Sequence, residues 1–207
     1  RAEPLRAYLG THEIFRRLSL ARCAGCGLVF ADPQPLASEL AAYYASYWSG
    51  EVAVSLPSTR RYYLTQALSR VHYIRRVAGL EGTPAVLDMG AGLGLFHDAL
   101  GRLAAMHAYT AVESDRDQLA ALKSRLGELA AFRDLAEVPT DRAFDLVVLA
   151  HVLEHATRPH ELVAALAAKL RPGGLLFVEV PNGDYRYKTN FESHLLFFDR
   201  PSLKELL

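Results

Sequence analysis

The residues best suited to bind a ligand follow a short apolar segment in the middle of the chain. Glycine accepts positive φ and lets a backbone approach a ligand closely, and open α/β sheets bind ligands at the carboxyl ends of their strands. An apolar segment here runs into three glycines spaced two apart, Val86-Leu87-Asp88-Met89-Gly90-Ala91-Gly92-Leu93-Gly94. The run therefore predicts a nucleotide-type ligand at the end of a first parallel strand.

Two positions of this run separate one class of nucleotide from another. The dinucleotide fingerprint places its third glycine at the sixth position, where this chain has Leu95. The Asp88 carboxylate, two residues before the first glycine, would repel a pyrophosphate but would suit a ligand that bears an ammonium and a sulfonium. S-adenosylmethionine carries both positive groups, so we expect this cofactor. An NAD-dependent oxidoreductase is the alternative enzyme class.

Acidic residues also follow the next two predicted strands. Glu113 lies 19 residues after Gly94, where an acidic side chain can accept hydrogen bonds from both ribose hydroxyls. The alternative for Glu113 is a solvated carboxylate at a helix start. Asp134 and Leu135 follow the third strand and are placed to meet an adenine amine and ring, or else they form a plain strand-ending turn.

The second half of the chain has the pattern of a doubly wound α/β fold. From Ala85 onward, short apolar runs alternate with amphipathic stretches, as in a mostly parallel sheet with helices on both faces. One predicted helix has its core face at Leu162, Val163, Leu166 and Leu170, and Arg171 to Gly174 should end it. The predicted strands are Ala85 to Met89, Tyr109 to Glu113, Ala130 to Arg133, Asp145 to Ala150 and Leu175 to Val180.

The first part of the chain has a different texture. Its features are a CxxC pair, an aromatic cluster and a helix with an apolar face that Gly79 would cap. We predict a small N-terminal appendage over residues 1–58 and a cofactor-binding domain over residues 59–207. The CxxC pair is Cys23 and Cys26; the aromatic cluster is Tyr43, Tyr44, Tyr47 and Trp48; the apolar helix face is Leu64, Ala67, Leu68, Val71 and Ile74.

Composition bounds the choice of partners. The 207 residues contain 23 Lys and Arg against 23 Asp and Glu, so no net positive field draws in nucleic acid. No apolar run approaches the roughly 20 residues that cross a bilayer, and no signal-type stretch opens the chain, so we expect no membrane partner and a cytoplasmic location. Arg1 and a helix start predicted at Ser202 suggest a piece of a longer chain. The oligomeric state is left open.

The order of the motifs resembles that of class I S-adenosylmethionine-dependent methyltransferases. VLDMGAGLG, AVES, RDL, FDLVVLAHVLEH and LRPGGLLFVEVPN follow one another from about Ala85 to Asn182. The resemblance implies a sheet of strand order 3-2-1-4-5-7-6, of which this chain would supply the first five strands. It also implies a cofactor site lined by Asp88, Gly90, Ala91, Gly92, Glu113, Ser114, Asp134, Leu135, Ala150 and His151.

The front segment extends the resemblance. Residues Arg22 to Phe30, with Asp32-Pro33 and the Tyr-rich stretch after them, are similar to the zinc-ribbon head of methyltransferases of sugar and antibiotic pathways. In those proteins a second CxxC completes a site of four thiolates. We therefore expect zinc only if a second cysteine pair lies outside this chain; otherwise the segment is a packed loop with two thiols.

Histidines are the candidates for the acceptor side. His151 directly follows the fourth predicted strand, and His155 either shares its helical face or packs the loop. The segment Phe191 to Phe198 is similar to the Tyr-x-Glu-His-x-x-x-Phe stretch of sugar C-methyltransferases, in which the histidine works as a base. Phe191 and Ser193 replace the Tyr and Glu of that pattern.

These residues predict the reaction. We expect His194 to be the general base, with His151 as the next candidate, or His194 to anchor a lid. The predicted chemistry is transfer of a methyl group from the sulfonium to an oxygen, nitrogen or carbon of a small-molecule acceptor. A cofactor-binding scaffold of the same fold without catalytic duty is the alternative outside enzymology.

Overall fold

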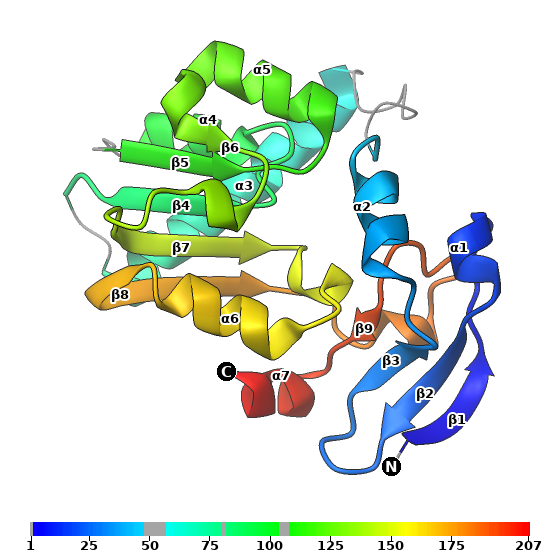
Figure 1. Cartoon of the computed structure of the whole chain (residues 1–207). Helices are drawn as coiled ribbons and strands as arrows, with labels where there is room; N and C mark the ends of the chain where they lie inside the picture. The colour runs from blue at the N-terminus through cyan, green and yellow to red at the C-terminus, as the bar shows by residue number, and fades with distance from the viewer. Residues whose placement is uncertain (1, 48–56, 80–81, 104–107) are drawn as a thin grey trace. The chain divides into compact units, whose positions relative to one another are not determined.

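The computed structural model describes residues 2–47, 57–79, 82–103 and 108–207, which fold into two compact units (Figure 1). Unit 1 consists of Arg1–Leu40, Ala150–Ala165 and Val178–Leu207; unit 2 consists of Ala41–Leu149 and Leu166–Phe177. The units do not follow a single division near residue 58, because two later segments return to the unit that the first residues form.

Unit 2 is built on a five-stranded sheet of order β6-β5-β4-β7-β8. β4 pairs in parallel with both β5 and β7, and β5 pairs in parallel with β6. The central strands are almost wholly apolar because helices cover both faces of a parallel sheet. The strand bounds are β4 Ala85–Met89, β5 Ala108–Val112, β6 Ala131–Phe132, β7 Phe144–Ala150 and β8 Leu170–Glu179. The predicted α/β class and strand order are confirmed.

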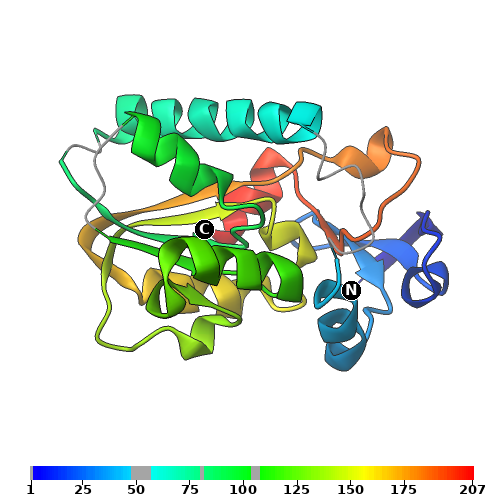
Figure 2. The ribbon, with the colours of Figure 1, turned by 90° about the horizontal axis from the view of Figure 1, so that it is seen from above.

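Helices lie on both faces of this sheet. Figure 2 shows α3 (Pro57–Ala78) and α4 (Leu95–Leu103) together on one face and α5 (Arg116–Leu126) on the other. Asp115 is the N-cap residue of α5. Its carboxylate accepts hydrogen bonds from the backbone amides of Asp117 and Gln118, each at 3.0 Å. Of the apolar face predicted for α3, Ala67, Val71 and Ile74 are buried, and Leu64 and Leu68 are half-buried.

The fifth predicted strand, β8, begins earlier than predicted. α6 (Pro159–Ala167) ends three residues before Leu170, which is the first residue of β8 and not part of a helix face. The reason is tertiary: the Phe144 amide donates to the Lys169 carbonyl at 2.9 Å, so the chain already joins the sheet there. The predicted turn at residues 171–174 therefore lies inside the strand.

Two shorter predictions were also wrong. β6 has two residues because a 3-10 turn, Glu128–Ala130, occupies the start of the predicted strand. The final helix, α7 (Arg200–Leu206), is capped by Asp199, with Ser202 as the third helical residue. Trp48 of the predicted aromatic cluster lies outside the described residues.

Of the two roles predicted for His155, the structure favours packing of the loop. His155 lies in a 3-10 turn, η4 (Leu153–His155), and not on an α-helix.

Unit 1 contains a four-stranded antiparallel sheet of order β1-β2-β3-β9. The bounds are β1 Ala2–Ala7, β2 Ser19–Cys23, β3 Val29–Asp32 and β9 Leu196–Phe197, with the short helix α1 (Glu13–Arg16) after β1; α2 (Ala37–Tyr44) follows β3 along the chain. The CxxC pair lies at the β2–β3 turn, where both thiols are free and half-buried. The N-terminal strands are thus completed by a strand near the C-terminus.

Tyr8 ties the first residues to the C-terminal segment of unit 1. Its side chain is 5% exposed and packs against Phe15 and Phe191. Its hydroxyl donates to the carbonyls of Phe191 and His194, at 2.6 and 2.9 Å. A buried hydroxyl with satisfied partners orders both segments.

Among the described residues, no helix is both long and apolar enough to cross a bilayer.

We expect Tyr8→Phe to lower the free energy of unfolding by about 1 to 3 kcal/mol, because the Phe191 and His194 carbonyls lose the Tyr8 hydroxyl and the Phe191 carbonyl keeps only the His194 amide, at 2.7 Å. Urea unfolding followed by circular dichroism measures this change. Tyr62→Phe is the matched control, since Tyr62 is 60% exposed. Equal unfolding midpoints for both variants would show that the Tyr8 hydroxyl does not stabilise unit 1.

Candidate functional site

The glycine-rich turn after β4 is held by the end of β5. The amides of Gly90 and Ala91 donate to the Val112 carbonyl at 2.8 and 3.0 Å. Gly90 has φ of 73° and Gly92 has φ of 51°, in the left-handed region where a Cβ is strained. The turn is therefore specific for glycine at these two positions.

Gly94 has a different use. It also has positive φ, but a Cβ built on it would lie 2.8 Å from Leu122 Cδ2 and closer still to the Arg125 guanidinium. Both side chains belong to α5. The third glycine of the run therefore allows the turn to pack against a helix, whereas the first two set the backbone path of the turn itself.

The Glu113 carboxylate joins this turn to the start of α5. It is 6% exposed; Oε2 accepts from the Gly92 amide at 2.7 Å and Oε1 from the Asp115 amide at 2.8 Å. Burial raises the pKa of Glu113, while these amide donors counteract the shift. Each carboxylate oxygen accepts more than one hydrogen bond, so Glu113 retains capacity for a ligand hydroxyl.

Asp88 is a buried acid beside the same turn. Its side chain is 4% exposed, and Oδ2 accepts a hydrogen bond from the Tyr109 hydroxyl. The pKa of Asp88 is raised to about 6: burial raises it, the hydrogen bond from Tyr109 lowers it, and the nearby charge of Glu113 raises it. A cation would offset this cost and an anion would add to it, so the acid pair fits a positively charged ligand.

The remaining predicted cofactor residues lie at or just after the ends of their own strands. Asp134 is exposed and caps the 3-10 turn η3 (Leu135–Glu137) by accepting from the Ala136 amide at 2.9 Å. Leu135 is half-buried and Ser114 is exposed. Ala150 is the last residue of β7 and His151 follows it; both belong to unit 1, whereas the other predicted cofactor residues belong to unit 2.

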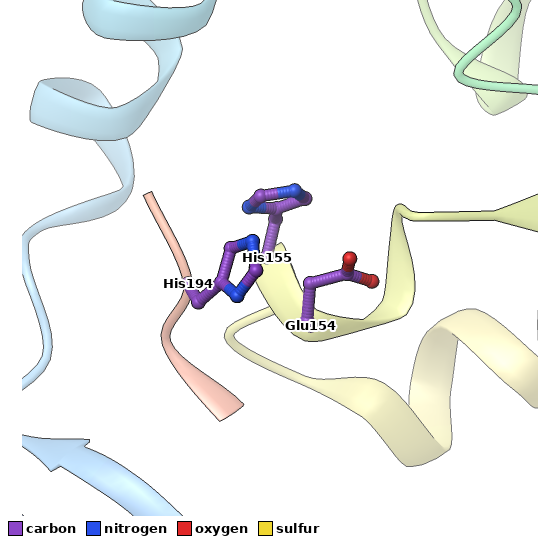
Figure 3. Close-up of side chains that lie close together, drawn as sticks. All are labelled: Glu154, His155 and His194. Atoms are coloured by element: carbon purple, nitrogen blue, oxygen red, sulfur yellow. The ribbon is translucent and has the colours of Figure 1, made fainter. Parts of the chain in front are cut away.

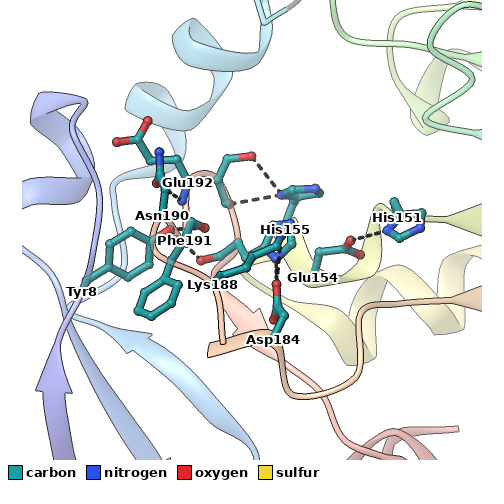
Figure 4. Close-up of polar contacts among 11 residues, drawn as sticks. Tyr8, His151, Glu154, His155, Asp184, Lys188, Asn190, Phe191 and Glu192 are labelled. Atoms are coloured by element: carbon teal, nitrogen blue, oxygen red, sulfur yellow. Dashed lines mark hydrogen bonds and ion pairs between the residues drawn. The ribbon is translucent and has the colours of Figure 1, made fainter. Parts of the chain in front are cut away.

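His151 is held between two carboxylates within unit 1, and Figure 4 shows its contact with Glu154. Its Nδ1 lies 3.2 Å from Glu154 Oε1 and its Nε2 lies 3.0 Å from Glu179 Oε1. Hydrogen bonding to Glu154, and then to Glu179, raises the pKa of His151 to about 9. His151 is therefore a cation at neutral pH. Separately, its backbone φ of 56° lies in the left-handed region, which is uncommon for a residue other than glycine.

His155 and His194 lie together in unit 1, their ring centroids 5.1 Å apart. His194 Nδ1 lies 2.8 Å from Asp184 Oδ2, and His155 Nδ1 lies 3.1 Å from the Ser193 carbonyl (Figure 4). Burial opposes the charged form of Asp184, but His194 and Lys188 outweigh it, so the pKa of Asp184 lies below its usual value.

Sequence reasoning missed the carboxylates that hold these histidines. Glu154 stands in the run His151 to His155, so its presence beside a histidine was visible in the sequence. Asp184 lies ten residues before His194, with no periodicity that predicts the contact. That pairing depends on the path of the chain between β8 and β9.

The family comparison matches residues 58–207 to the family described as "Methyltransferase domain". Among curated proteins, the ubiquinone biosynthesis O-methyltransferase of Nitrosococcus oceani is 30% identical over 120 residues, which cover 55% of this chain and 50% of that protein. The enzyme of the same name from Xylella fastidiosa is 37% identical over 122 residues, covering 55% and 48%. The chain spans at most about half the length of these relatives.

Solved structures show the same fold at low sequence identity. A SAM dependent methyltransferase from Archaeoglobus fulgidus has a TM-score of 0.54 at 20% identity and covers 71% of this chain and 66% of its own. Coclaurine N-methyltransferase, bound to N-methylheliamine and SAH, has a TM-score of 0.52 at 16% identity, covering 68% and 47%. At this level of identity the likeness concerns the fold.

We expect Asp88→Asn to stabilise the protein at neutral pH. An acid whose folded pKa is about 6 against an ordinary 3.8 is penalised above that range by about 3 kcal/mol. The penalty is absent below the unfolded pKa, where both states are protonated, and is complete above about pH 6. The gain from the variant should therefore grow between these values.

Urea unfolding from about pH 3.5 to about pH 7.5 measures this difference. Asp141→Asn is the control because Asp141 is exposed. A wild-type and Asp88→Asn difference that stays constant across the range would contradict a raised pKa.

Proposed function

The chain belongs to the methyltransferase-domain family and is a class I S-adenosylmethionine-dependent methyltransferase, and from this premise we propose that it methylates an oxygen atom of a small-molecule acceptor. The observation that carries the proposal is the glycine turn bonded to the buried Glu113, with Asp88 beside it. The ubiquinone O-methyltransferases among the relatives support oxygen as the acceptor atom. The ribbon-like front segment favours a pathway of sugar or secondary-metabolite biosynthesis.

The cofactor residues divide by the part of S-adenosylmethionine that they would hold. The turn with Asp88, Gly90, Ala91 and Gly92 would receive the amino acid portion and its positive charges. Glu113 would accept hydrogen bonds from the ribose hydroxyls, and the Ser114 hydroxyl would donate one to them. Asp134 would lie near the amine of the adenine, and Leu135 would pack against its ring. Ala150 and His151 would complete the lining.

Bound S-adenosylmethionine supplies an electrophilic methyl group on a good leaving group. The acceptor oxygen forms the new bond to carbon as the carbon–sulfur bond breaks, the bonding electrons stay on sulfur, and the acceptor proton leaves to a base. The protein contributes alignment, exclusion of water and that base.

His194 is our candidate for the base. Its imidazole is 8% exposed, and Nδ1 is directed to Asp184, so Nε2 is the nitrogen left to exchange a proton. His151, the second candidate, has a pKa of about 9 and is already protonated near pH 7. In this proposal His151 stabilises negative charge and His194 accepts the proton.

Glu113→Ala should weaken binding of S-adenosylhomocysteine by about 10 to 100 fold, because one or two charge-assisted hydrogen bonds are lost. Titration calorimetry measures the affinity. Glu128→Ala is the matched control, since the Glu128 side chain is 76% exposed. Wild-type affinity in Glu113→Ala would place the ribose contact elsewhere, and heat with NAD but none with S-adenosylhomocysteine would contradict the proposed function.

His194→Ala should lower the methyl-transfer rate by about 100 to 10,000 fold and leave cofactor affinity unchanged. The measurement is single-turnover transfer to an acceptor found by screening phenols, catechols and sugars. His160→Ala is the control, because His160 is an exposed residue of α6. Near-normal turnover, or loss of cofactor together with activity, would count against His194 as the base.

A further inference from the structure

Unit 1 contains a cluster of three side chains of the types that bind metal ions. One ligand atom each from Glu154, His155 and His194 lies within 4.8 Å of the other two (Figure 3). Glu154 is 1% exposed and His194 is 8% exposed. Glu154 and His155 come from η4, and His194 comes from the segment before β9, so the fold brings them together.

Both histidines have a contact at Nδ1. His194 Nδ1 lies 2.8 Å from Asp184 Oδ2, an ion-pair contact without hydrogen-bond geometry, and His155 Nδ1 lies 3.1 Å from the Ser193 carbonyl. With a proton on Nδ1, each ring would keep the lone pair of Nε2 for a metal ion. Histidines that bind metals typically have their other nitrogen held in this way by a carboxylate or a carbonyl.

Glu154 supplies the observation that points to an ion. Its Oε1 contacts His151, but its Oε2 is buried and has no hydrogen-bond partner among the described residues. Leaving a buried carboxylate oxygen unpaired is costly, and a cation bound to it would remove the cost.

Carboxylates surround the cluster. Glu154 and Glu179 contact His151, and Asp184 contacts both Lys188 and His194. The buried Oε2 of Glu154 thus lies in an environment rich in carboxylates, which favours a cation.

We propose that Glu154, His155 and His194 bind a divalent first-row transition metal ion. Two imidazole nitrogens and one carboxylate oxygen form a three-ligand set that leaves positions open for water or an acceptor oxygen. A hydroxyl bound there would have a lowered pKa. A metal-bound Nε2 has no lone pair for a proton, so with the ion bound the hydroxyl of the acceptor would lose its proton to solvent water instead of to His194. Metal binding does not rest on the proposed methyl transfer.

The test is titration of the full chain, stripped of metal by chelation, with Co²⁺ followed by its visible absorption and by direct metal analysis. We expect one ion per chain. Glu154→Gln, His155→Asn and His194→Asn should each weaken binding by at least about 100 fold. Asp184→Asn keeps all three ligands and should weaken binding by about 10 to 100 fold.

Two matched controls lie on α6: His160→Asn and Glu161→Gln change exposed residues of the same types and should bind as the wild type does. Replacing both Cys23 and Cys26 with Ser should also leave the spectrum unchanged, which excludes the thiols as the site. Circular dichroism identifies any variant that does not fold, and Glu154→Gln keeps the shape of the side chain.

The proposal is overturned if the wild type binds no Co²⁺, or if the three ligand variants bind as the controls do. Calorimetry with S-adenosylhomocysteine on the same samples keeps this result separate from the proposed function. Binding of S-adenosylhomocysteine without binding of Co²⁺ would contradict only the proposed metal site. Binding of Co²⁺ without binding of S-adenosylhomocysteine would contradict only the proposed methyl transfer.

Discussion

The parallel hydrogen-bond ladder of unit 2 continues beyond the ends of its strands, and the candidate cofactor site depends on this continuation. Gly90 and Ala91 bond to the end of β5, and Glu113, the next residue of that strand's path, donates its amide to the Phe132 carbonyl at 2.9 Å. Backbone groups that leave a sheet must find partners. Here they do so on the adjacent strand, which brings the Glu113 carboxylate against Gly92.

The same arrangement concentrates negative charge where the chain has little water to solvate it. Asp88 and Glu113 are both buried, and each is harder to ionise for that reason. A structure selected for stability alone would have apolar or neutral residues there. Acids whose cost a cationic ligand would offset are typical of binding sites, where function is retained at the expense of stability.

Unit 1 is organised by contacts between distant parts of the chain. β3 pairs with β9, with Val29 opposite Phe197, and the Tyr8 hydroxyl bonds to carbonyls near the C-terminus. These contacts hold the segment that carries His194. The histidine cluster and the N-terminal sheet therefore belong to one unit, although the sequence separates them by more than a hundred residues.

The sequence by itself determined the α/β class, the central strands and the glycine turn, because apolar runs and glycine spacing are local properties that the sheet preserves. It also predicted a chemical use for Asp88, Glu113 and His194, and the structure shows all three to be buried. Only the tertiary structure decided the start of β8 at Leu170, the two-residue β6 and the pairing of Asp184 with His194. Those features depend on which backbone and side-chain groups meet across long stretches of chain, and no local pattern encodes such meetings.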